Sequence, residues 1–226
     1  MKISVLIPAY NEASQIGLLI NELRQMNITP IVVDDGSFDD TGKEAEKNGA
    51  KIIKHRKNMG KGASLKTGFE YILDEEREFD AILIMDGDGQ HSPGDIHKFT
   101  KLAEKEENSF IIGNRMNNVR NMPLSRKLTN KFMSLIISGL CGQNIPDTQC
   151  GFRLLKKDLV KKINIEFSRF EVESELLIKA SRLGSRILSV PIQTLYGQES
   201  SQINPFQDTI RFISFLVKYI FKKSAR

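Results

Sequence analysis

Residues 81–91 read Ala-Ile-Leu-Ile-Met-Asp-Gly-Asp-Gly-Gln-His, and this segment is the most informative of the chain. Five consecutive apolar residues followed by an Asp-Gly pair are typical of a strand that is buried on both faces and ends in a turn. Two upstream segments have the same form: Ile3–Ile7 leads into Pro8–Glu12, and Ile31–Val33 leads into Asp34–Asp40. A helix-like stretch follows each strand. This alternation predicts an α/β fold with a doubly wound, mostly parallel sheet flanked by helices.

The remaining elements are predicted from hydrophobic periodicity. In the first half we expect helices over 12–26, 41–48, 63–73 and from Ser92 onward, and further strands at 52–53 and 110–112. In the second half we expect helices over 125–141, 174–183 and 206–223, a polar loop over 144–153 and a strand-like segment over 187–195. Because no repeat or Pro/Gly/Ser linker divides the chain, we predict one domain over residues 1–226.

Composition excludes several classes of protein. Hydrophobic residues make up 40% and charged residues 27% of the 226 residues, which argues against a disordered tail or a fibre. The net charge of +5 permits an anionic partner, but the basic residues are dispersed and no recognition motif predicts nucleic-acid binding. Cys141 and Cys150 match no zinc or redox motif, which favours a reduced intracellular setting. No apolar stretch reaches the roughly 18 residues that a membrane span needs.

Three polar clusters follow the predicted strands, at Pro8–Glu12, Asp34–Asp40 and Asp86–His91. Ligands of doubly wound sheets bind beyond the carboxyl ends of the strands. Mg²⁺ takes carboxylate and amide oxygens, so Asp86, Asp88 and Gln90 are candidate metal ligands; the alternative is a solvated Asp-Gly turn. An acid at the end of the second strand commonly receives a ribose or a base edge, which is the role we expect for Asp35.

A glycine-rich segment, Asn58–Ala63, precedes the predicted third helix. It matches neither a dinucleotide fingerprint nor a phosphate-binding P-loop, because Leu65 takes the place of the third glycine and Gly62 follows Lys61. Two interpretations stay open: a flexible entrance to the helix, or direct contact with a substrate.

Taken in order, these motifs resemble family 2 glycosyltransferases of the GT-A fold. Further motifs are similar to those of the polyprenyl- (dolichyl-) phosphate mannosyl- and glucosyltransferases in their single-domain form, and the resemblance extends from about residue 3 to about residue 215. These further motifs are Gly113–Arg115, Ser125–Lys127, Asp147–Arg153 and Phe170–Glu173.

The resemblance implies a metal-dependent, inverting hexosyltransferase. The donor would be a nucleotide-sugar of the GDP-mannose or UDP-glucose type, and the acceptor a polyprenyl (dolichyl) phosphate at the cytoplasmic face of the membrane. Residues of about 1–115 would bind the nucleotide-sugar, and residues of about 116–226 would bind the acceptor and face the membrane.

The resemblance also implies roles for individual residues. The nucleotide-sugar would contact Pro8, Tyr10, Glu12, Val33, Asp35, Asp86, Gly87, Asp88 and Arg115. Asp86, Asp88 and Gln90 would bind Mg²⁺ or Mn²⁺. The acceptor would contact Arg115, Arg126, Asp147, Gln149 and Arg153, and the catalytic residues would be Asp88, Arg115 and Arg126.

The nature of the acceptor determines which catalytic groups are needed. A lipid monophosphate is mostly ionised near neutral pH, since its second pKa is about 6, so it needs cations such as Arg115 and Arg126 rather than a base. A sugar hydroxyl, as in surface polysaccharide synthesis, would need a carboxylate base, for which Glu171, Glu173 and Glu175 are candidates. These acids would also be favoured in the first turn of a helix by its dipole.

The predicted helices 125–141 and 206–223 combine apolar and basic residues, as interfacial amphipathic helices do, although core packing is the alternative. We expect a cytoplasmic protein that associates peripherally with the membrane surface, and a separate membrane-anchoring protein is a further candidate partner. One departure from the family pattern is that segment 196–201 has no lysine after Tyr196-Gly197. A non-enzymatic nucleotide-binding or membrane-docking module is therefore a rival hypothesis.

Overall fold

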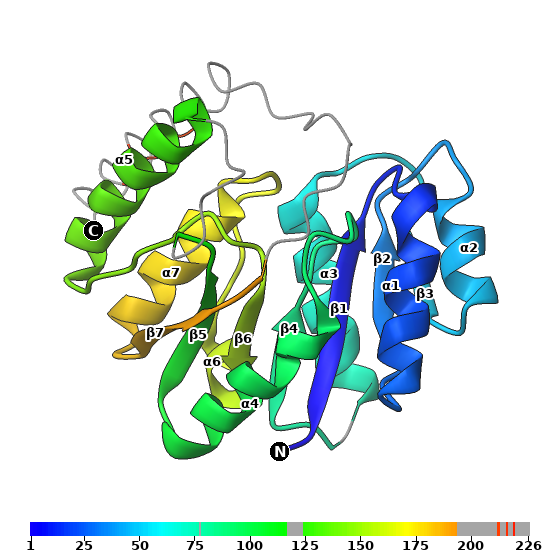
Figure 1. The fold of residues 1–226 in the computed structure, drawn as a ribbon, viewed down its shortest axis with the longest axis horizontal. Helices are drawn as coiled ribbons and strands as arrows, with labels where there is room; N and C mark the ends of the chain where they lie inside the picture. Colours follow the sequence, from blue (N-terminus) through cyan, green and yellow to red (C-terminus); the bar gives the residue numbers. More distant parts are fainter. Residues whose placement is uncertain (77, 117–123, 194–211, 213–215, 217–218, 220–226) are drawn as a thin grey trace.

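A computed structural model describes residues 1–76, 78–116 and 124–193, together with Phe212, Leu216 and Tyr219 (Figure 1). The described strands form one mixed sheet in the order β3-β2-β1-β4-β6-β5-β7. They are β1 (Ile3–Ala9), β2 (Ile31–Asp34), β3 (Lys51–Lys54), β4 (Ala81–Ile84), β5 (Ser109–Asn114), β6 (Arg153–Lys156) and β7 (Arg186–Pro191).

The sheet is mostly parallel, as predicted. β1 pairs in parallel with β2 and β4, β2 with β3, and β5 with β7. β6 is antiparallel to both of its neighbours, β4 and β5. The predicted loop over 144–153 is therefore wrong at its end, because Arg153 begins a strand. This strand has only four residues, two of them apolar, which is too short to give a clear periodic signal.

Most of the described helices pack on the sheet, and one packs on another helix. α3 packs on β1 and β2, α4 on β5 and α7 on β7, whereas α5 packs against α7 (Figure 1). Most of the predicted helix 206–223 lies outside the described residues. The described helices are α1 (Ala13–Gln25), α2 (Thr41–Lys47), α3 (Lys61–Glu75), α4 (Ile96–Lys105), α5 (Leu124–Cys141), α6 (Lys157–Lys162), α7 (Val172–Arg182) and a short 3₁₀ helix over Pro93–Asp95.

The centre of the sheet forms the core. Every residue of β4 is buried, as are Val5–Ile7 of β1, which explains why these strands read as continuous apolar runs. α3 approaches β1 closely at Gly68. Because glycine has no Cβ, the side chain of Leu6 can take the space where one would lie. Among the described helices, none is long and apolar enough to cross a bilayer. Parallel pairing at this centre brings the carboxyl ends of β1, β2 and β4 to one edge of the sheet.

Candidate functional site

The loop after β4 carries the two candidate metal ligands. Its shape is fixed by local hydrogen bonds: Oδ1 of Asp88 accepts from the backbone N–H of Gln90 (2.9 Å), and Nδ1 of His91 accepts from the N–H of Asp86 (3.3 Å). Gly89 has a φ of +69°, a conformation that glycine adopts without strain. The ring of His91 stacks on Phe152, and its burial lowers the pKa of His91 to about 4. His91 is therefore a neutral support of the loop.

The carboxylate of Asp86 lies in a tight environment. Its Oδ1 is 2.5 Å from Nζ of Lys61, and its other oxygen lies against Gly151, where any Cβ would collide with it. Burial would raise the pKa of Asp86, but the charge of Lys61 outweighs this effect and holds that pKa well below its usual range. No ion pair of Asp88 is found among the described residues. Burial and then the charge of Asp86 raise the pKa of Asp88 to about 6, although the charges of Lys61 and Arg115 oppose this rise.

Asp86, Asp88 and Gln90 fit a divalent cation whose remaining coordination positions are filled by waters or by a phosphate ligand. The described residues contain no group of three or more His, Cys, Asp or Glu side chains arranged to hold a metal. Mg²⁺, however, usually binds through one or two carboxylates together with waters and substrate phosphates. Asp86 and Asp88 supply two carboxylates, one of which is destabilised by the negative charge of the other, and Gln90 is half-buried in the same loop.

The ends of β1 and β2 form the adjacent part of the edge. Pro8 and Val33 are register partners there, and Tyr10 makes an edge-to-face contact with the exposed ring of Phe38 (6.4 Å). Glu12 is half-buried just before α1. The structure thus brings the predicted nucleotide residues of these two strands together. A hollow of about 400 Å³ lies on the segments that follow β2 and β3, and it is lined by Gly36, Ser37, Phe38, Lys54, His55 and Arg56.

Asp35 is held firmly at the end of β2. Its Oδ1 accepts from Nδ1 of His55 (2.7 Å) and from the N–H of Met59 (2.9 Å), and its Oδ2 accepts from the N–H of Gly60 (2.7 Å). Sequence reasoning missed His55. Its place directly after β3, on the same edge of the sheet, was the signal that could have found it.

The glycine-rich segment is closely packed against another part of the chain. The backbone of residues Phe167 and Ser168 takes the space where Cβ atoms at Gly62 and Gly60 would lie, and the N–H of Ala63 donates to the carbonyl of Ser168 (3.1 Å). The glycines therefore allow a loop from the second half of the chain to pack against the start of α3. This packing directs Lys61, the first residue of α3, toward Asp86.

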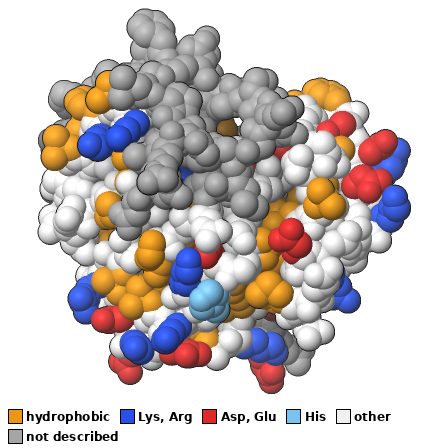
Figure 2. Space-filling view, in the orientation of Figure 1, with side chains coloured by type: hydrophobic (Ala, Val, Ile, Leu, Met, Phe, Trp, Pro, Cys, Tyr) orange, Lys and Arg blue, Asp and Glu red, His pale blue; other side chains and the backbone are white. Residues whose placement is uncertain are grey.

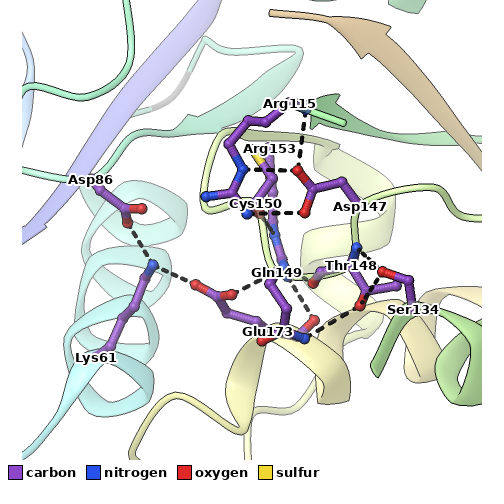
Figure 3. Close-up of polar contacts among 10 residues, drawn as sticks. All are labelled: Lys61, Asp86, Arg115, Ser134, Asp147, Thr148, Gln149, Cys150, Arg153 and Glu173. Carbon is purple, nitrogen blue, oxygen red and sulfur yellow. Dashed lines mark hydrogen bonds and ion pairs between the residues drawn. The ribbon is translucent and has the colours of Figure 1, made fainter. Parts of the chain in front are cut away.

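Arg115 and Asp147 form a two-pronged ion pair at the end of β5 (Figure 3). Nε and Nη2 of Arg115 donate to Oδ2 and Oδ1 of Asp147 at 2.8 and 2.9 Å, and the backbone N–H of Arg115 donates to Oδ2 as well. Burial opposes the charged forms, yet each partner stabilises the other, so the pKa of Arg115 is raised and that of Asp147 is lowered. Asp147 thus orients a guanidinium that lies close enough to Asp86 to influence its pKa.

The other predicted acceptor residues differ in their surroundings. Arg153 is only 1% exposed, and its guanidinium donates to the carbonyls of Cys150, Glu173 and Thr148, so it supports the loop beneath the site. Gln149 is half-buried and donates to Oγ1 of Thr148 (3.3 Å). The acceptor contacts predicted for these residues stay predictions. Arg126 lies in the first turn of α5, but its side chain and segment 196–201 lie outside what the structure describes.

Two of the three candidate bases already hold the fold together. Glu175 is fully buried, accepts the N–H groups of Glu166 (2.8 Å) and Phe167 (3.0 Å), and pairs with Lys179. Glu173 pairs with Lys61 (2.6 Å). Both lie in the first turn of α7, as the helix dipole favours.

Comparison with known proteins agrees with this geometry. The family model described as "Glycosyl transferase family 2" matches residues 4–164. The chain belongs to this family. This family 2 enzyme is 34% identical to the UDP-N-acetylglucosamine–dolichyl-phosphate N-acetylglucosaminyltransferase of Methanococcus voltae, over 88% of the chain and 87% of that relative. It is 29% identical to the undecaprenyl-phosphate mannosyltransferase of Micrococcus luteus, over 85% of the chain and 83% of that relative.

A solved structure supports the fold of the family 2 enzyme. Glucosyl-3-phosphoglycerate synthase from Mycobacterium tuberculosis, in complex with Mn²⁺, UDP and phosphoglyceric acid, has a TM-score of 0.74 at 19% identity, covering 96% of this chain and 78% of that one. The fold is therefore that of the GT-A glycosyltransferases, and the enzyme is a glycosyltransferase, as the sequence motifs predicted.

Proposed function

We propose that this enzyme transfers a hexose-class sugar from a nucleoside diphosphate to a polyprenyl phosphate, with inversion, at the cytoplasmic face of a membrane. The names of the two curated relatives support the acceptor class. The observation that carries the proposal is the arrangement at the sheet edge: the Asp86–Asp88 pair lies near Arg115, while Glu173 and Glu175 are engaged in the fold. This arrangement suits a phosphate nucleophile, which needs cations and no strong base.

The donor would bind along the ends of β1, β2 and β4. Asp35, with His55 behind it, would receive the nucleoside, and Pro8, Tyr10, Glu12 and Val33 would line its path. Asp86, Asp88 and Gln90 would hold Mg²⁺ or Mn²⁺, which stabilises the negative charge that develops on the departing diphosphate. Gly87 keeps the loop close to β1, since a Cβ there would press against Ala9.

The acceptor phosphate would bind between Arg115 and the start of α5. Arg115 offers a guanidinium whose direction is set by Asp147. Asn130, one helical turn after Arg126, is 7% exposed and its Nδ2 has no hydrogen-bond partner in the described structure. An unsatisfied buried donor costs on the order of 1–3 kcal/mol, a cost that a bound phosphate would remove.

The exposed face of α5 supports a membrane-facing position. Leu128, Phe132 and Leu135 are well exposed at helical spacing, and Lys131 is exposed on the same helix. Figure 2 shows hydrophobic and basic side chains together over this part of the molecule. Basic residues beside an exposed apolar stripe are typical of a helix that lies in a membrane interface.

The test is transfer of labelled sugar to a polyprenyl phosphate in detergent micelles with Mn²⁺ or Mg²⁺. Donors should include UDP-N-acetylglucosamine, UDP-glucose and GDP-mannose. We expect one donor to yield an organic-extractable product, and no product with Asp88→Asn. A labelled glycan acceptor without any labelled lipid would refute the proposal and favour the hydroxyl-acceptor reaction.

A further inference from the structure

Lys61 is buried between two carboxylates that come from different parts of the chain. Its Nζ lies 2.5 Å from Oδ1 of Asp86, after β4, and 2.6 Å from Oε1 of Glu173, in α7. The side chain of Lys61 is 11% exposed. Figure 3 shows the ammonium lying directly between the two acidic groups.

The position of this lysine is electrostatically costly without its partners. Lys61 is the first residue of α3, where the helix dipole favours anions and disfavours cations. Burial would also lower the pKa of Lys61, but the charges of Asp86 and Glu173 outweigh this effect and raise it. The lysine is thus kept as a buried cation by the two carboxylates.

The same contact occupies an oxygen that a metal would need. Oδ1 of Asp86 is taken by Lys61, and the other oxygen lies against the backbone at Gly151. A divalent cation bound at about 2.0–2.1 Å from Asp86 would bring its charge close to the ammonium. The metal ion and the ammonium of Lys61 would repel each other strongly when both contact Asp86. They would therefore compete for this one carboxylate.

We propose that Lys61 is a resident counter-ion: it holds Asp86 when no divalent cation is bound and moves onto Glu173 alone when one binds. This inference rests on the proposed metal site and deepens it. Lys61 acts as a positioning residue that weakens metal binding in the absence of donor. A nucleoside diphosphate relieves the competition, because its oxygens offer both cations further ligands.

The test measures Mn²⁺ binding without donor by electron paramagnetic resonance of free Mn²⁺. We expect Lys61→Met to bind Mn²⁺ about tenfold or more tightly than the unaltered chain, because a nearby positive charge is removed. We expect Glu173→Gln to bind it more weakly, because Lys61 then pairs with Asp86 alone. Lys66→Met, at an exposed position of the same helix, is the matched control and should bind Mn²⁺ unchanged.

A merely structural role for Lys61 would give a different result. If folded Lys61→Met binds Mn²⁺ equally or more weakly, the inference is wrong. Lys61→Met leaves the buried Glu173 with only the longer ion pair to Arg153 (3.6 Å), so Lys61→Met/Glu173→Gln serves as a second variant and should also bind Mn²⁺ more tightly. If the unaltered chain binds no Mn²⁺ even with nucleoside diphosphate, both the metal site and this inference fail.

A crystal structure with Mn²⁺ and a nucleoside diphosphate gives an independent check that needs no variant. We expect Nζ of Lys61 to lie beyond hydrogen-bond distance of Asp86 and still within it of Glu173. Retention of the contact with Oδ1 of Asp86 beside a bound metal would overturn the inference.

Discussion

At the scale of single residues, the two aspartates of the β4 loop have opposite environments. Asp86 has a buried cation beside it, whereas Asp88 faces the charge of Asp86 with only a backbone N–H as a described hydrogen-bond partner. A carboxyl pKa raised from 3.8 to about 6 corresponds to on the order of 3 kcal/mol in favour of the protonated form. Without a metal, ionised Asp88 therefore destabilises the folded state.

Asp88→Asn tests this strain through stability. The folded pKa lies above the unfolded one, so the folded state binds more protons and its stability falls as pH rises through about 6. Without metal, we expect the variant to melt roughly 6–12 °C higher than the unaltered chain at pH 7.5, with little difference at pH 4. Differential scanning calorimetry at both pH values measures the effect. Equal melting temperatures at pH 7.5 would contradict it.

Metal binding should reverse the order of stability. Mn²⁺ with UDP or GDP stabilises only the form that binds it, so the unaltered chain should gain melting temperature and Asp88→Asn should not. Asparagine can still accept the N–H of Gln90, so the loop is retained and the comparison isolates the charge.

At the scale of elements, α5 has two different faces. Its inner face carries Ser134 and Ser138, whose hydroxyls accept the N–H groups of Thr148 (3.1 Å) and Ile145 (3.0 Å) and so fix the loop that holds Asp147. Its outer face exposes apolar side chains. One helix therefore supports the site on one side and carries an exposed apolar face on the other, which is the face that we propose meets the lipid carrier.

Replacement of Leu128, Phe132 and Leu135 by serine tests the outer face. We expect the triple variant to sediment with phosphatidylglycerol vesicles about tenfold more weakly, because the apolar area that would enter the interface is lost. The melting temperature should change little, since these side chains are exposed. Leu18→Ser, at an exposed position of α1, is the control. Unchanged vesicle binding by the triple variant would exclude this face as the membrane contact.

At the scale of the whole molecule, the two halves of the chain are interleaved. β6 inserts between β4 and β5, and the loop at 167–168 packs on the start of α3. The sheet and the candidate site both contain residues from before and after residue 115, so this position does not separate two structural units. The predicted division of donor and acceptor binding near residue 115 stays a prediction. We therefore expect the whole described fold to unfold in one cooperative transition.

The two thiols report on this cooperativity. Both cysteines are buried, which raises the pKa of Cys150 to about 12 and that of Cys141 to about 11. At pH 8 the folded protein should show no fast reaction with Ellman's reagent, since the thiolate is the reactive form. In guanidinium chloride both thiols should react along the same transition as the loss of circular dichroism. Fast labelling of either thiol in the folded state would contradict this prediction.

The sequence alone located six of the seven described strands along the chain and the polar residues that follow β1, β2 and β4. Apolar runs that end in Asp34-Asp35 and in Asp86-Gly87-Asp88 are local patterns, and parallel pairing brings such ends to one edge whatever the details of packing. The family followed from the same motifs in their order. A four-residue strand such as β6 has no comparable pattern, so the antiparallel insertion was not foreseen.

The tertiary structure determined how the charges are shared. Lys61, Asp86 and Glu173 are far apart in the chain, and their contact depends on how the loop at 167–168 packs against Gly60 and Gly62. The same is true of His55 behind Asp35 and of Asp147 beneath Arg115. Burial and ion pairing depend on distances between elements, and no local pattern of residues specifies those distances.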